Sequence, residues 1–133
     1  MYRVLVTGSR NWKDPYAVSV RLNNVLLKHE PFLLVHGRNR HGADRIADDW
    51  ARAAREAGAR VYVRPMAAKW VHRGSGYNRN QEMVDFGADV CFAFIARCIK
   101  QGCPQQGKHG SHGATDCAGR ARKAGIPTYT YEQ

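Results

Sequence analysis

Residues 88–95, ADVCFAFI, form an almost continuous apolar run in a chain of 133 residues. A strand that is apolar at successive positions, rather than at alternate ones, is typical of a parallel sheet covered on both faces. The run is also short, which favours a strand over a buried helix. This segment therefore predicts a central strand of a parallel sheet.

The segments on either side alternate between strand and helix patterns. Short apolar runs predict further strands, and apolar residues at helical spacing, with Asp14 and Asp44 as N-caps, predict helices. The expected strands are 4–6, 32–35, 60–64, 88–95 and 126–131, and the expected helices are 15–29, the segment between Asp44 and Gly58, 78–86 and 115–124. Right-handed crossovers turn this alternation into a doubly wound, Rossmann-like α/β fold with a parallel five-stranded sheet and helices on both faces. Residues 1–133 are expected to form one domain.

The composition excludes some classes of protein and favours an anionic partner. Hydrophobic residues make up 44% of the chain, which is enough for a globular core. No apolar run has the length of a membrane span, and the first residues lack a signal-peptide pattern, so we expect a cytoplasmic protein without a membrane partner. The net charge of +10 favours nucleic acid, a nucleotide or phosphate, although a solvated basic surface is the alternative.

The charged residues are distributed unevenly between the two kinds of loop. The strand-to-helix loops, 8–13, 36–43, 64–77 and 96–114, contain ten of the 21 Lys and Arg residues, none of the 11 acidic residues and five of the six histidines. The ten are Arg10, Lys13, Arg38, Arg40, Arg64, Lys69, Arg73, Arg97, Lys100 and Lys108. In a parallel sheet these loops share one edge, where ligands bind near the topological switch point. This pattern predicts an anionic ligand at that edge.

Glycine-rich turns follow the first two expected strands. Gly8 and Ser9 follow the first strand, and Gly37 and Gly42 follow the second, just before a helix. Glycine lets the backbone approach a phosphate, and a helix N-terminus attracts an anion. Neither a GxGxxG nor a P-loop motif is present, so the sequence does not predict a standard dinucleotide or ATP site.

Aromatic residues lie near the same edge. Trp12, Trp70 and Tyr77 either stack on a base or cover the end of the sheet, and the sequence does not decide between these interpretations. Trp50 falls on the apolar face of its helix and is expected in the core.

The longest strand-to-helix loop, 96–114, reads as an insertion that contains possible metal ligands. Cys98, Cys103, His109 and His112 have the spacing C-x4-C-x5-H-x2-H, and two Cys with two His suit tetrahedral Zn²⁺. A structural zinc ion would order a glycine-rich loop that cannot bury much apolar surface.

Other interpretations of these residues remain open. In one interpretation, Cys98 and Cys103 form a disulfide, which a reducing compartment disfavours. In another, the histidines contact ligand phosphate instead of metal. In a variant of the zinc hypothesis, Cys117 replaces one histidine as a metal ligand. In the other interpretation, Cys91 and Cys117 are small buried residues of the core.

Five motifs together resemble the YspA-related SLOG family, a Rossmann-like group from bacteria and phages that is related to the LOG and DprA proteins. They are VTGSR at 6–10, HGRNRHGAD at 36–44, GYNRNQEM at 76–83, ADVCFAFI at 88–95 and GSHGATDCAGRARKAGIP at 110–127. The resemblance implies an actinobacterial or phage type of protein that binds a nucleotide or an ADP-ribose-like ligand. By position, it implies a pocket lined by Gly8, Ser9, Arg10, Gly37, Gly42, Ala43, Asp44, Arg79, Asn80, Ser111, Gly113 and Thr115.

The sequence departs from the LOG enzymes at their catalytic segment, PGGxGTxxE. The nearest counterpart here, residues 111–116, lacks the glutamate, which leaves Glu82 and Asp116 as candidate acid–base residues. The favoured function is nucleotide binding or sensing, and the alternative is a hydrolase of the phosphoribohydrolase or N-glycosidase type. A second alternative is nucleic-acid binding, although a concave charged edge suits a small ligand better than a duplex. A homo-oligomer is compatible with all three functions.

Overall fold

The computed structural model describes residues 1–72, 74–105 and 107–133 and contains a parallel five-stranded sheet with four helices. The strands are β1 (Tyr2–Gly8), β2 (Phe32–His36), β3 (Val61–Pro65), β4 (Val90–Ile95) and β5 (Thr128–Glu132). The helices are α1 (Pro15–His29), α2 (Ala43–Glu56), α3 (Ser75–Phe86) and α4 (His112–Lys123). Arg73, one of the basic loop residues noted above, lies outside the described residues.

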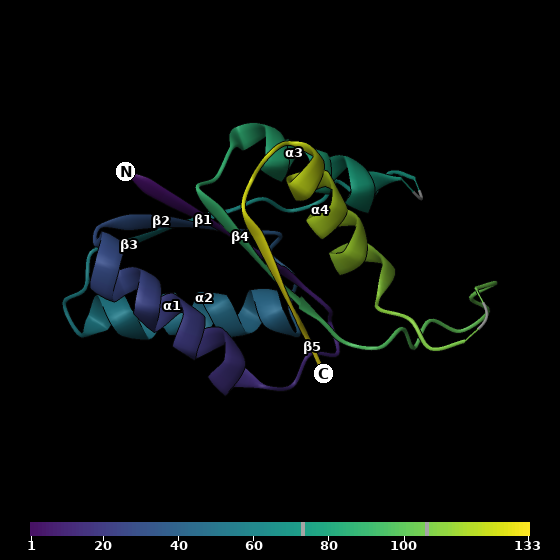
Figure 1. The fold of residues 1–133 in the computed structure, drawn as a ribbon, viewed down its shortest axis with the longest axis horizontal. Coiled ribbons are helices and arrows are strands. Elements are labelled where there is room, and N and C mark those ends of the chain that lie inside the picture. Colours follow the sequence, from purple (N-terminus) through teal and green to yellow (C-terminus); the bar gives the residue numbers. More distant parts are fainter. Residues whose placement is uncertain (73, 106) are drawn as a thin grey trace.

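The sheet has the order β3-β2-β1-β4-β5, so the chain begins in the middle and builds outward in both directions. Helices α1 and α2 lie on one side of the sheet, and α3 and α4 lie on the other (Figure 1). This arrangement confirms the doubly wound α/β fold. The topological switch point lies between β1 and β4, where the two halves diverge.

The predicted central strand forms much of the core. From Val90 to Phe94, every residue of β4 is buried, and both faces of the strand are covered near its middle. The strand begins at Val90 rather than at residue 88, because Asp89 is exposed and its carboxylate accepts the amide N–H of Arg3. Trp12 is also buried and packs against Phe94, so this tryptophan covers the end of the sheet and does not offer a free stacking face.

The helix boundaries agree with the sequence in part. Helix α1 has the predicted bounds, and Asp14 caps it by accepting the amide N–H of Ala17. The predicted Asp44 cap is wrong, because Gly42, at φ +75°, is the N-cap of α2 and Asp44 is buried in its first turn. Trp50 on this helix is half-buried and packs against the core as expected.

The two later helices begin earlier than predicted. Helix α3 starts at Ser75, whose hydroxyl accepts the amides of Val71 and His72 and so fixes the turn before the helix. Helix α4 starts at His112, directly after Ser111. Asp116, named above as a candidate acid–base residue, lies in the second turn of this helix and does not cap it. Among the described residues, no helix combines the length and the apolar character needed to cross a membrane.

Candidate ligand site and metal cluster

Ser9 joins three elements at the switch point. Its amide donates to the carbonyl of Phe94 at 2.9 Å, and its hydroxyl accepts the amide of Ala96 at 2.8 Å. The Ser9 carbonyl accepts the amide of Ala43 at the start of α2, and the hydroxyl also contacts that of Ser111 at the start of α4. The loop after β1 is therefore fixed between the N-terminal ends of two helices.

Gly8 and Gly42 allow this close approach. A Cβ on Gly8 would overlap the Cβ of Ala43, and a Cβ on Gly42 would overlap the carbonyl oxygen of Ser9. Gly42 also has a positive φ, which a larger residue adopts only with strain. Both glycines therefore pack strand, loop and helix together, whatever further role they have toward a ligand.

A buried polar cluster surrounds Gly37. The Arg79 guanidinium donates to the Gly37 carbonyl at 2.5 Å and to Asn80 Oδ1 at 3.1 Å, and a Cβ on Gly37 would collide with it. Asp44 lies beside the same glycine, and its Oδ2 accepts the amide of Asn39 at 3.2 Å. The cluster thus connects the loop after β2 with α3 and α2.

Asp44 has an unusual environment for a carboxylate. Its side chain is 5% exposed, and its Oδ1 has no hydrogen-bond partner in the described part of the chain. Burial raises the pKa of Asp44, and His36, the Asn39 amide and Arg79 offset this effect in part. One carboxylate oxygen is therefore buried without a geometric hydrogen-bond partner, a setting that favours the protonated form of the carboxyl.

Asn80 and Asp116 connect α3 to α4. The Asn80 amide donates to the Gly113 carbonyl and to Asp116 Oδ2, both at 3.1 Å. Arg120 donates to the same carboxylate oxygen at 2.8 Å. Asp116 is thus held by a cation and an amide, whereas Glu82 is exposed on α3.

The sequence reasoning missed one pair near this site. His36 is buried, its Nε2 donates to Asp48 at 2.9 Å, and its Nδ1 accepts the amide of Arg38. The non-glycine Arg38 has φ +55°, so the hydrogen bond holds the loop in a left-handed turn. The only sequence signal was the spacing of Asp48 one helical turn after Asp44.

Several predicted site residues are accessible at the same edge. Arg10, Gly113 and Thr115 are exposed, and the Arg10 guanidinium lies 5.8 Å from the ring centre of Trp70. Trp70 is 64% exposed and does not cover the sheet, whereas Tyr77 is 40% exposed. The described basic residues of the four loops are also all exposed.

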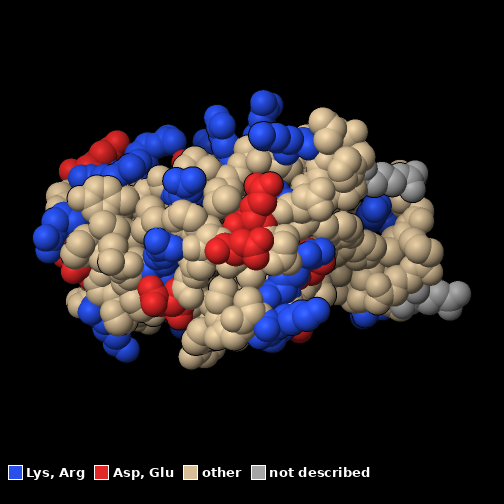
Figure 2. Space-filling model, turned by 90° about the horizontal axis from the view of Figure 1, so that it is seen from above, with Lys and Arg blue, Asp and Glu red and all other residues tan. Residues whose placement is uncertain are grey.

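Positive charge extends beyond this edge. Figure 2 shows Lys and Arg side chains around the margins of the α3–α4 face, with a group of acidic side chains near its middle. The helices thus carry charges of both signs, in contrast to the one-signed loops.

The four predicted metal ligands lie together at the first residue of α4 and in the segment before it, which extends beyond the end of the sheet in Figure 1. The ligand atoms of Cys98, Cys103, His109 and His112 all lie within 4.8 Å of one another. Four of the separations are 3.2 Å between the two His Nε2 atoms and 3.3, 3.5 and 3.6 Å between Cys Sγ and His Nε2 atoms. A tetrahedral Zn²⁺ with its usual bond lengths would place such atoms roughly 3.3–3.8 Å apart.

Backbone contacts support this cluster. His109 Nδ1 donates to the Gly107 carbonyl at 2.9 Å, which leaves Nε2 as the lone-pair nitrogen that a metal requires. The Cys98 amide donates to the His109 carbonyl at 2.8 Å, and Arg97 forms an antiparallel bridge with Gly110. A hollow of about 300 Å³ adjoins the cluster and extends to Thr115 and Asp116. The segment therefore has the geometry of a metal-binding loop.

The other two cysteines lie elsewhere. Cys91 and Cys117 are buried in the apolar core, and all four cysteines are free thiols. Burial raises the pKa of Cys91 far above its usual range and that of Cys117 to about 11. Cys117 therefore does not join the cluster, and both residues are packing residues as the sequence indicated.

Comparisons with known proteins agree with these features. Residues 2–70 match the model of the YspA, cpYpsA-related SLOG family. The chain is also 40% identical to the Gene 61 protein of Mycobacterium phage D29, over 98% of this chain and 97% of that protein. The chain belongs to the YspA, cpYpsA-related SLOG family. The family match ends before α3, so it covers the half of the chain that contains the Ser9 loop and Asp44. The similarity to the phage protein also covers the segment with Cys98, Cys103, His109 and His112.

Proposed function

We propose that this SLOG protein binds a nucleotide or a nucleotide-derived, ADP-ribose-like anion at the carboxyl ends of β1 and β4. The observation that carries this proposal is the convergence of the α2 and α4 N-termini on the Ser9 loop. Two helix N-termini at one switch point provide oriented amides and partial positive charge for a phosphate group. The exposed loop cations add to this field.

The accessible residues have separate roles in the proposed complex. Arg10 and the first-turn amides of α4 bind phosphate, with Gly113 leaving room for the approach. Trp70, exposed beside Arg10, stacks on the base. Asp44 Oδ1 is buried without a partner in the described part of the chain, so it would accept a hydroxyl or amino group only from a ligand that displaces the residues covering it.

The cluster at Cys98, Cys103, His109 and His112 is the proposed structural zinc site. Two thiolates and two imidazoles form a closed set with no open position, so the metal would order the loop and would not activate water. His112 is both a proposed ligand and the first residue of α4, so the metal would also position the amides at this helix N-terminus. Zinc would thereby stabilise the ligand site without being part of it.

The geometry favours binding over hydrolysis. Asp116 is engaged by Arg120 and Asn80, and Asp44 is buried with one oxygen already bonded. Glu82 is exposed on the surface of α3. A general acid or base needs a carboxylate within reach of the scissile bond, and no such carboxylate is evident among these three.

Calorimetric titration with AMP, ADP, ADP-ribose and inorganic phosphate tests the proposal. At least one nucleotide should bind, and Arg10→Ala should weaken its binding by about 1–3 kcal/mol, the scale of a charge-assisted hydrogen bond. Arg55→Ala, an exposed arginine in the last turn of α2, is the matched control and should bind as wild type does. Equal loss in both variants would mean that only net charge matters, and absence of binding to the whole panel would reject the proposed ligand class.

A further inference from the structure

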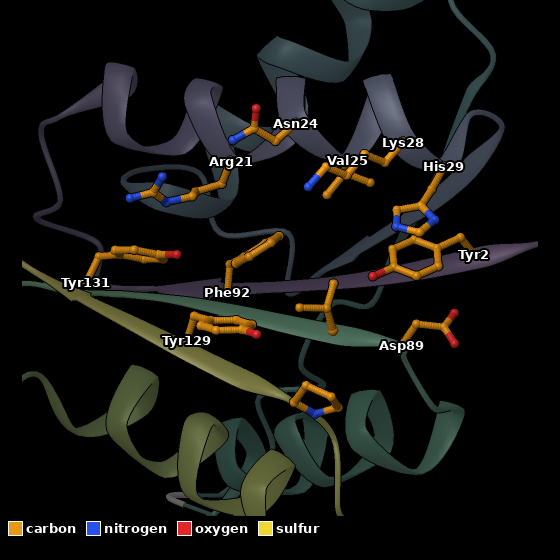
Figure 3. Close-up of a pocket in the computed structure, with 12 residues that line it drawn as sticks. Tyr2, Arg21, Asn24, Val25, Lys28, His29, Asp89, Phe92, Tyr129 and Tyr131 are labelled. Carbon is orange, nitrogen blue, oxygen red and sulfur yellow. The ribbon is translucent and has the colours of Figure 1, made fainter.

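A groove of about 390 Å³ lies away from the ligand site, between α1 and the half of the sheet made by β4 and β5 (Figure 3). Helices α1 and α2 pack over β1, β2 and β3, whereas α4 packs on β4 and β5 from the other side. Among the described elements, the α1-facing side of β5 is therefore only partly covered, with Tyr129 54% exposed, whereas Phe92 of β4 is buried. In a doubly wound fold, helices normally cover both faces of the sheet. Exposed side chains on this face therefore indicate which kind of ligand could bind there.

The floor of the groove is aromatic. Tyr129 and Tyr131 project from the same face of β5, next to Phe92 of β4, with ring centres 6.1 and 6.5 Å from Phe92. Tyr129 is 54% exposed, which is a large value for an aromatic residue within a strand. Alternate residues of a strand lie roughly 6.6 Å apart, so the two tyrosines present neighbouring rings along one line.

The wall of the groove is cationic and polar. Arg21, Asn24 and Lys28 of α1 line this wall, and the Arg21 side chain extends along the helix above Tyr131 (Figure 3). The Arg21 guanidinium lies 4.4 Å from the centre of the Tyr131 ring, and Tyr2 stacks on His29 at the other end of the groove. The one carboxylate among the lining residues, Asp89, accepts the Arg3 amide. The groove thus combines ring faces with positive charge along its length.

We propose that this groove binds a short segment of single-stranded nucleic acid. A base stacks on the open face of Tyr129, a second stacks on the Arg21 guanidinium, and the backbone phosphates contact Lys28. Aromatic rings on an exposed sheet face, combined with a cationic rim, are the usual means of holding unpaired bases. A second copy of this chain is a poorer occupant, because it would bring Arg21 and Lys28 toward a protein that also carries a net charge of +10. This site is separate from the nucleotide site proposed above and does not depend on it.

Fluorescence anisotropy of a labelled eight-nucleotide oligothymidylate at low salt tests the proposal. Tyr129→Ala should weaken binding about 5- to 150-fold, the usual range for one stacked base. Tyr62→Ala is the matched control, because Tyr62 lies in the other edge strand and is 50% exposed, yet does not line the groove. Tyr129→Phe keeps the ring and should bind as wild type does, which separates stacking from a change in fold.

The salt dependence provides an independent measurement. Lys28→Gln should reduce the slope of log affinity against log salt by somewhat less than one, as expected when one phosphate contact on a single strand is lost. Lys123→Gln, in the last turn of α4, is the control and should leave the slope unchanged.

Three results would overturn the proposal. They are equal losses in Tyr129→Ala and Tyr62→Ala, tighter binding of a duplex of the same sequence, or no binding of the single strand by the wild type. If Arg10→Ala abolished oligonucleotide binding while Tyr129→Ala did not, the nucleic acid would belong to the strand edge and the groove proposal would fail, although nucleotide binding at that edge would stand.

Discussion

The hydroxyl of Ser9 contacts the hydroxyl of Ser111, although 102 positions separate them in the chain. Ser9 follows the first strand, and Ser111 lies between the proposed metal ligands His109 and His112. The contact therefore connects the switch point of the sheet with the Cys/His segment. If that segment binds zinc, the metal and the nucleotide site are parts of one structure.

The first prediction concerns metal content. Protein purified without a His tag should contain about one equivalent of zinc, measured by elemental analysis, because two thiols and two imidazoles place their ligand atoms within 4.8 Å of one another. His109→Ala should lose most of it. His41→Ala, which removes an exposed histidine outside the cluster, should keep the full amount. Less than about one tenth of an equivalent in the wild type would remove the zinc hypothesis.

A second prediction connects the metal to the ligand. Removal of zinc with a chelator should weaken nucleotide binding and lower the melting temperature. The reason is that the segment containing Ser111 and the start of α4 would lose the metal ion that orders it. Addition of zinc should restore both properties. Unchanged affinity in the metal-free protein would show that the Ser9–Ser111 contact does not transmit the state of the metal.

The third prediction uses two glycines of α4. A Cβ on Gly113 or on Gly119 would meet no atom within 4 Å, so both substitutions should leave the fold intact. Gly113 lies in the first turn, where the phosphate is proposed to bind, and Gly119 lies further along the same helix. Gly113→Leu should therefore abolish nucleotide binding, whereas Gly119→Leu should not. Calorimetry measures the affinity of each variant, and retention of full affinity by Gly113→Leu would place the ligand elsewhere.

Gly8→Val and Gly42→Val are unsuitable tests because their side chains would collide with the protein itself.

A fourth prediction concerns catalysis. The protein should release little or no free base from nucleoside monophosphates, because Asp116 is held by Arg120 and Asn80. Chromatography of the reaction mixture measures the released base. Robust release that Glu82→Gln or Asp116→Asn removes would reverse this expectation and make the chain a hydrolase.

Local patterns predicted the elements well because they depend on neighbours in sequence. The bounds of α1 follow from Asp14, Pro15 and the helical spacing, and β4 follows from its apolar run. The four candidate metal ligands lie within one short segment, so their spacing alone predicted that they would cluster.

Features that depend on distant residues could not be read from the sequence. The burial of Asp44 results from packing against the Gly37–Arg79 pair, and the overlap of Gly8 with Ala43 results from the approach of α2 to β1. Among the described elements, the groove results from the position of β5 at the edge of the sheet, where α1 covers that strand only in part, and this depends on strand order.

The last prediction concerns the buried Asp44 carboxylate and the pH dependence of stability. Burial raises the pKa of Asp44 in the folded protein above its value of 3.8 in an unfolded chain, so the folded state holds its proton more tightly. The stabilising contribution is therefore complete below that value and is lost as the pH rises through the raised pKa. Asp44→Asn keeps the shape but cannot ionise, so the free energy of unfolding of the wild type should fall relative to this variant as the pH rises above about 4.

Urea titrations of both proteins across this range measure the difference. The comparison removes the common effect of zinc loss in acid, because both proteins would release the metal alike. Asp49→Asn is the control, since Asp49 pairs with Arg45 on the exposed surface of the same helix, and such pairs contribute at most about 1 kcal/mol. A wild type that gained stability over Asp44→Asn as the pH rose would mean that Arg79 and the Asn39 amide outweigh burial. Asp44 would then be a structural anion whose charge the surrounding protein stabilises.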